Sequence, residues 1–223
     1  MPEFRETLPP HERHFVGRFE SFGDIVVGFS LSELALQFAL PKSGPDLVAD
    51  PVRYLAFFAT FTIVAQFWMR FHRVMASGFA PYRLDLGLAF AYLAFVALVP
   101  YSLLAMLHLG SAGFRYSLGL YIALMLALTT TNLCLMVLAL RRAWRFLDDG
   151  RRRVGWKAVV VTGALAPMLA AAMAADVATG WQAAVEILTL MWFVVLGGSR
   201  LLRAPRPGWL GIDDGTFAPN AVS

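Results

Sequence analysis

The sequence contains few charged residues and a single cysteine. Asp, Glu, Lys and Arg make up only 15% of its 223 residues, whereas 58% are hydrophobic. Soluble globular proteins carry about 25% charged residues. Cys134 has no partner in the chain, so an intrachain disulfide is excluded. The motifs HExxH and CxxC and a glycine-rich phosphate loop are also missing, and the four histidines are scattered. We therefore expect neither an enzyme nor a resident metal or cofactor.

Long apolar segments recur along the chain instead. A helix that spans a bilayer needs about 20 mainly apolar residues, and six segments approach this length. They are residues 22–40, 54–69, 84–109, 118–140, 158–177 and 181–202. The first two are the weakest, because Glu33 and Gln37 interrupt the first and Gln66 the second. The sequence predicts an all-α, polytopic membrane protein with six transmembrane helices.

The basic residues predict the orientation of these helices. In the six-span arrangement, all 19 Lys and Arg residues except Lys42, Arg53 and Arg115 fall on the side of both termini. Cytoplasmic loops are enriched in Lys and Arg, so we expect both termini in the cytoplasm. Residues 1–21 then form a cytoplasmic N-terminal arm, 22–202 the transmembrane domain, and 203–223 a flexible cytoplasmic tail. The excess of positive charge is explained by topology, and we expect no nucleic-acid partner.

Glu33 lies within the first predicted span, where an ionisable residue needs a partner, water or a function. A charge at the centre of a span costs about 2.5–3.5 kcal/mol on insertion scales. Phe29, Glu33 and Leu36 share one face of a helix, with Ser32 beside them. If this face lined a symmetric path, Phe29 and Leu36 would form constrictions and Glu33 a ring of carboxylates that favours cations. Alternatively, Glu33 is protonated or hydrogen-bonded to a neighbouring helix, and the stripe is ordinary packing.

A second group of residues marks the cytoplasmic ends of the first three spans. Polar and aromatic residues at one membrane level can form a hydrogen-bonded cluster that holds helices together. The residues concerned are Arg18, Phe22, Asp24, Trp68, His72 and Asp85. The alternative is that they are separate anchors, with Trp at the headgroup level and Arg reaching to water.

These residues carry a resemblance to a known family. RxxxFxD at Arg18 to Asp24, Trp68 and His72 at the end of the second span, LDLGLAFAYLAFVALVPY in the third, and the six-span layout resemble the transmembrane protein 175 family of potassium channels, in its short prokaryotic form. The family usually has Ser at the position of Gly23, and Ile or Leu at those of Phe29 and Glu33.

The resemblance implies a passive channel for monovalent cations, with potassium as the ion and no carbonyl filter motif. It implies a homotetramer whose first helices surround the pore, with Phe29, Ser32, Glu33 and Leu36 facing it. The expected location is the cell membrane, with the protein as a multi-pass component of a bacterial inner membrane. Two alternatives remain open: a proton-coupled carrier that uses Glu33, and a non-conducting scaffold of the same fold.

Overall fold

The computed structural model describes residues 4–36, 51–108, 110–188 and 190. The helices in these residues are α1 (Phe4–Thr7), α2 (Pro10–Leu36), α4 (Pro51–Gly78), α5 (Arg83–His108), α6 (Gly110–Ala143) and α7 (Asp149–Ala178). Residues 181–188 are also helical, and the described part of the chain contains no strand. The all-helical fold class is therefore confirmed.

Within the described residues, three helices are long and apolar enough to cross a membrane. They comprise Arg83–Met106, Gly113–Ala143 and Asp149–Ala178, with 24, 31 and 30 residues. Apolar helices of this length fit a membrane-embedded protein. The first, second and sixth spans stay predictions, as does the cytoplasmic position of the termini. Most of the sixth span and the whole tail 203–223 lie outside the described residues.

Helix α2 begins much earlier than the predicted first span. It starts at Pro10, so most of the segment expected to be an N-terminal arm is helical and continuous with the following apolar part. Proline is favoured in the first turn of a helix, and Glu12 in the same turn suits the positive end of the helix dipole. Val16 and Phe19 are buried against the other helices, which the charged residues around them concealed.

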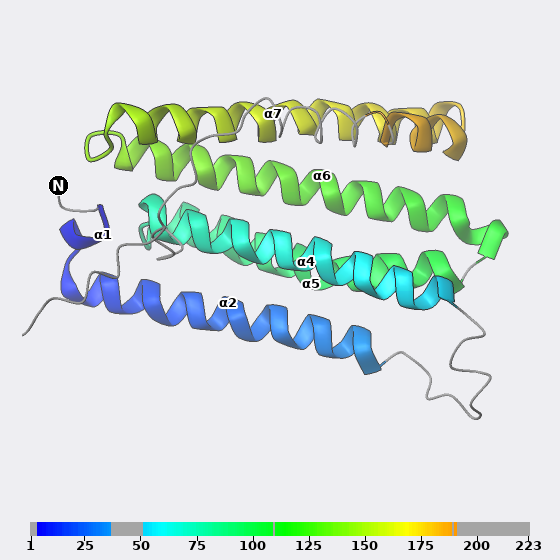
Figure 1. Cartoon of the computed structure of the whole chain (residues 1–223), viewed down its shortest axis with the longest axis horizontal. Helices are drawn as coiled ribbons and strands as arrows, with labels where there is room; N and C mark the ends of the chain where they lie inside the picture. The colour runs from blue at the N-terminus through cyan, green and yellow to red at the C-terminus, as the bar shows by residue number, and fades with distance from the viewer. Residues whose placement is uncertain (1–3, 37–50, 109, 189, 191–223) are drawn as a thin grey trace, which may run out of the picture.

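The long helices lie side by side and run in alternating directions (Figure 1). Helices α5 and α6, and α6 and α7, are in contact, and α2 packs against α4 and α5. Helices α2 and α7 lie on opposite outer sides of the bundle. From α4 onward the connections between successive helices are short, and a helix followed by a short turn must return along its neighbour.

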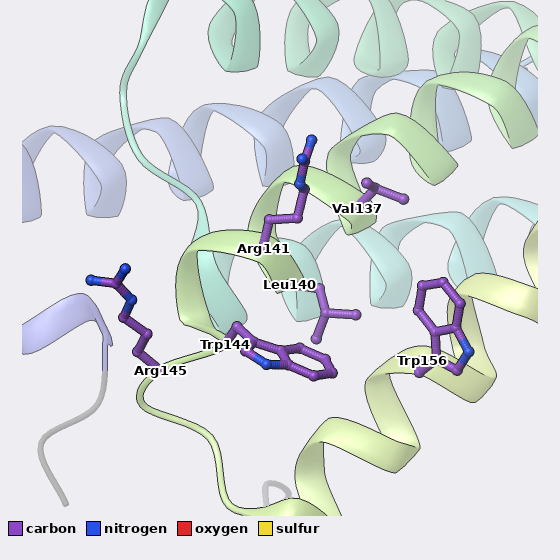
Figure 2. A pocket seen from close by; sticks show the side chains of 6 residues that line it. All are labelled: Val137, Leu140, Arg141, Trp144, Arg145 and Trp156. Atoms are coloured by element: carbon purple, nitrogen blue, oxygen red, sulfur yellow. The ribbon is translucent and has the colours of Figure 1, made fainter.

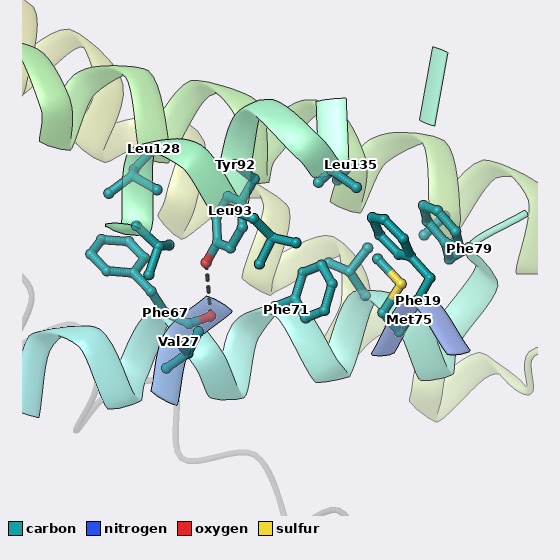
Figure 3. Packing of buried hydrophobic residues seen from close by; sticks show 14 of the residues in the cluster. Phe19, Val27, Phe67, Phe71, Met75, Phe79, Tyr92, Leu93, Leu128 and Leu135 are labelled. Carbon is teal, nitrogen blue, oxygen red and sulfur yellow. Dashed lines mark hydrogen bonds between the residues drawn. The ribbon is translucent and has the colours of Figure 1, made fainter. Parts of the chain in front are cut away.

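The core is rich in aromatic rings and lies between α2, α4, α5 and α6. Figure 3 shows Phe71, Phe79 and Tyr92 packed with residues of α2 and α6. The Tyr92 hydroxyl donates a hydrogen bond of 2.8 Å to the Phe67 carbonyl oxygen, so the buried phenol is satisfied. This packing fixes which side of α2 turns inward.

Candidate functional site

The predicted pore stripe lies on the outer face of α2. Phe29 is 73% exposed and Leu36 84% exposed. Ser32 and Glu33 are exposed as well. The inward face of the same helix presents other residues to the core, namely Val16, Phe19, Gly23, Val27, Ser30 and Leu34. The described helices of this chain therefore leave the stripe uncovered.

The two polar side chains of the stripe make few interactions with the described residues. The Ser32 hydroxyl donates to the Gly28 carbonyl oxygen at 2.9 Å, one turn earlier in α2. Glu33 forms no ion pair or hydrogen bond with any other described residue. The interpretation in which Glu33 bonds to a neighbouring helix finds no partner among these residues. The described residues leave its carboxyl group exposed.

Asp24 joins α2 to α4 through two hydrogen bonds. Its Oδ1 accepts a bond of 2.8 Å from Trp68 Nε1 and lies 2.8 Å from His72 Nε2. Trp68 and His72 are one turn apart on α4, and their rings meet edge to face with centroids 4.7 Å apart. Asp24 is half exposed, with 50% of its side chain accessible. Three of the six residues predicted to cluster are therefore in direct contact.

Gly23 allows α2 to approach α4 closely beside this cluster. A Cβ atom at position 23 would lie 2.6 Å from Cε1 of Phe71, a distance that real side chains do not tolerate. A serine at this position, as is usual in the family that the sequence resembles, would collide with the Phe71 ring. In this chain an aromatic contact replaces the hydroxyl group, and Phe71 is almost fully buried.

Asp85 lies in a different ion pair. Its carboxylate receives two hydrogen bonds from Arg142 of α6, at 2.5 and 2.7 Å, in a bidentate arrangement. Only 2% of the Asp85 side chain is exposed. The Arg142 guanidinium also lies 4.9 Å from the centre of the Tyr82 ring. The sequence pattern predicted that Asp85 lies near the start of a helix, but it did not single out Arg142 as its partner.

The remaining two predicted members are not bonded to the cluster. Arg18 is exposed and makes no hydrogen bond or ion pair with Asp24, Asp85 or any other described residue. Phe22 is 43% exposed. Its ring contacts those of Phe19 and Phe90, with centroid distances of 6.1 and 5.9 Å. Phe22 thus contributes to packing between α2 and α5.

An ion pair that the sequence did not suggest ties α1 to α2. Arg5 donates to both carboxylate oxygens of Glu20, at 3.3 and 3.0 Å. The two residues are separated by fifteen positions, so no helical spacing connects them. The turn between α1 and α2 brings them together.

Comparisons with known proteins agree with this architecture. Residues 18–100, which span most of α2, all of α4 and most of α5, match the family model described as endosomal/lysosomal potassium channel TMEM175. No curated protein matches the sequence.

A solved structure resembles the chain over most of its length. It is the crystal structure of a lysosomal potassium-selective channel TMEM175 homolog from Chamaesiphon minutus. The TM-score is 0.62 at 19% sequence identity, and the match covers 82% of this chain and 98% of that one. At this identity the match establishes the fold. The resemblance to the TMEM175 family is therefore confirmed, by the family model over residues 18–100 and by the shared fold over most of the chain.

Proposed function

We propose that this protein is a passive cation channel in the cell membrane, with potassium as the conducted ion. In this proposal the chain crosses the bilayer six times with both termini in the cytoplasm. Four copies assemble, and α2 of each copy lines a central pore with Phe29, Ser32, Glu33 and Leu36. The proposal assigns no catalytic step to any residue.

The uncovered stripe on α2 carries the proposal. Glu33 stands in a helix whose opposite face is packed in the core, and nothing else in the described chain covers it. A carboxylate that faced acyl chains would cost about 2.5–3.5 kcal/mol on insertion scales. Water shared between copies of the chain removes that cost. A stripe of this kind is therefore better explained by a path between subunits than by contact with lipid.

The chemistry of the stripe favours cations. Phe29 and Leu36 lie on either side of Glu33 along the helix, so repeated around an axis they would form two narrow apolar rings. A ring of Glu33 carboxylates between them would attract cations and raise their local concentration. Ser32 already donates its hydroxyl hydrogen to Gly28, so its oxygen presents lone pairs outward.

The similarity to a structure described as potassium-selective supports potassium as the ion. The family model points the same way, and its match includes the whole stripe within residues 18–100. Phe29 and Glu33 stand where the family usually has Ile or Leu. Because one side chain is bulkier and the other ionisable, the ion preference of this protein is the property to measure.

The test is ion flux through the purified protein in liposomes. We expect passive potassium flux down its gradient, unchanged when a proton gradient is added. Strict dependence on the proton gradient would identify the carrier instead, and the absence of flux under both conditions would support the scaffold.

A single substitution tests the stripe. We expect Glu33→Gln to reduce cation flux about tenfold, because a ring of charges concentrates counter-ions by about that factor or more. Glu12→Gln is the matched control, since it removes the same charge from α2 outside the stripe. Equal flux in both variants and in the parent would remove Glu33 from the pore.

A further inference from the structure

A hollow of about 290 Å³ lies between the end of α6 and the start of α7, far along the chain from the α2 stripe. Figure 2 shows its lining, in which Trp144 and Trp156 lie on either side of Leu140. The lining residues are Val137, Leu140, Arg141, Trp144, Arg145 and Trp156. The lining is therefore mainly aromatic and apolar, with two arginines at its rim.

The hollow lies where a membrane edge is expected. The apolar, membrane-length part of α6 ends at Ala143, directly before Trp144. Tryptophan is enriched at the headgroup level of bilayers, because its ring is apolar and its N–H is polar. Trp144 and Trp156 are 42% and 58% exposed. Both rings are thus presented to the surroundings at this level.

The two arginines of the hollow lack an acidic partner among the described residues, as do Arg153 and Lys157 outside the lining. Arg142 pairs with Asp85, and Arg152 with Asp149. Among the described residues, neither Arg141 nor Arg145 forms an ion pair or a hydrogen bond. Both are exposed; Arg141 lies in the last turn of α6 and Arg145 in the turn that follows the helix, and in Figure 2 their side chains point in different directions. Two uncompensated positive charges therefore border the aromatic wall.

The walls of the hollow are held in place by contacts between the two helices. Arg152 Nε donates to the Trp144 carbonyl oxygen at 3.0 Å, and its guanidinium lies 5.3 Å from the centre of the Trp144 ring. On the other side, Gly155 packs so closely on Leu140 that a Cβ there would lie 2.7 Å from Cδ1.

The nearby start of α7 does not compete for an anion. Asp148 caps this helix by accepting a hydrogen bond of 2.7 Å from the Arg151 backbone N–H. The terminus is thus already neutralised by a carboxylate, and the unpaired positive charge of this region that borders the hollow belongs to Arg141 and Arg145.

We propose that this hollow binds the headgroup of an anionic phospholipid. Arg141 and Arg145 at the rim attract the negatively charged headgroup, and the glycerol and upper acyl carbons rest against Trp144, Trp156 and Leu140. Basic sites between helices at the membrane edge suit acidic headgroups. The aromatic wall distinguishes a lipid from free phosphate, because an inorganic ion gains nothing from it. This inference does not depend on ion conduction.

Native mass spectrometry of the purified full chain in detergent tests the proposal. The probes are phosphatidylglycerol and phosphatidylcholine with the same acyl chains. We expect phosphatidylglycerol to remain bound preferentially. The double variant Arg141→Gln and Arg145→Gln should weaken its binding about tenfold and leave phosphatidylcholine unchanged, as expected for two lost surface charges.

The matched control is Arg153→Gln with Lys157→Gln. It removes two positive charges from the same region without touching the lining. We expect less than about a twofold change in this control, because screened charges outside a site contribute little. An equal loss in both double variants would overturn the proposal in favour of a diffuse basic surface.

A second variant and a competitor separate the lipid from a simple anion. The Trp156 ring is exposed, so Trp156→Ala removes little buried packing, and we expect it to weaken phosphatidylglycerol binding as well. Inorganic phosphate should not displace the lipid at equal concentration. Displacement by phosphate, or unchanged lipid binding in Trp156→Ala, would refute the lipid assignment.

Discussion

Two carboxylates of this protein each tie a pair of helices together, and they do so in opposite environments. Asp85 joins α5 to α6 through a bidentate pair with Arg142 and has 2% of its side chain exposed. Asp24 joins α2 to α4 through Trp68 and His72 and has 50% exposed. A buried charge that loses its partner cannot turn to solvent, whereas an exposed one can. Similar bonds should therefore differ greatly in what their loss costs.

The largest expected effect is at the buried pair. Arg142→Gln leaves the Asp85 carboxylate without its cation, and we expect a loss of about 3–5 kcal/mol in the free energy of unfolding. The measurement is unfolding in mixed micelles with increasing SDS, followed by circular dichroism. Arg153→Gln is the exposed control and should be neutral. Replacing both partners, as Asp85→Leu with Arg142→Met, should recover most of the loss; failure to do so would show that the pair has a role beyond mutual compensation.

A smaller effect is expected where α2 meets α4. Gly23→Ser restores the residue usual in the resembling family but directs its side chain at the Phe71 ring. We expect a destabilisation of about 1–3 kcal/mol, typical of overpacking. Gly28→Ser is the control on the same helix, because no atom lies within 4 Å of a Cβ there. If Gly23→Ser and Gly28→Ser had the same free energy of unfolding, the close contact between Gly23 and Phe71 would be refuted.

Removing one hydrogen bond to the exposed Asp24 should lower the free energy of unfolding by a smaller amount. Trp68→Phe retains the ring but loses the Nε1 donor to Asp24, and we expect a loss of about 0.5–1.5 kcal/mol. The same unfolding assay applies, with Trp156→Phe as the control. If Trp68→Phe lowered the free energy of unfolding as much as Arg142→Gln, the exposed Asp24 and the buried Asp85 would not differ as we expect.

The weakest effect is expected at the ion pair between α1 and α2. Glu20→Gln removes one charge from a pair whose side chains are 35% and 19% exposed. We expect a change below about 1 kcal/mol that shrinks further at high salt, because solvent ions screen partly exposed pairs. Arg153→Gln, at an exposed residue, serves as the reference. If the loss in the free energy of unfolding did not depend on salt, the Arg5–Glu20 pair would behave like the buried pair of Asp85 and Arg142.

The sequence was informative where one helix could be read by itself. The spacing of Phe29, Glu33 and Leu36 placed them on one face, and the structure leaves that face uncovered. The spacing of Trp68 and His72 likewise placed both on one side of α4, where both reach Asp24. Helical periodicity is a local property, so these groupings follow from the order of residues.

The sequence was less informative about partners on different helices. Asp85 was expected to join Asp24, but it pairs with Arg142, which lies 57 residues away. Several arginines stand near Arg142 in the sequence, and nothing in their order distinguishes the one that turns inward. The start of α2 at Pro10 was also missed, because charged residues surround Val16 and Phe19 and concealed their burial.

By itself, the amino-acid sequence determined that this is a helical protein for a lipid environment, since its apolar segments and scarce charges leave few other solutions. It also determined which residues share a helix face. Only the tertiary structure decided which face turns inward, which carboxylate meets which cation, and where α6 and α7 enclose a hollow. Those choices depend on contacts between helices, and such contacts are set by the fit of whole surfaces and leave no periodic signal in any single segment.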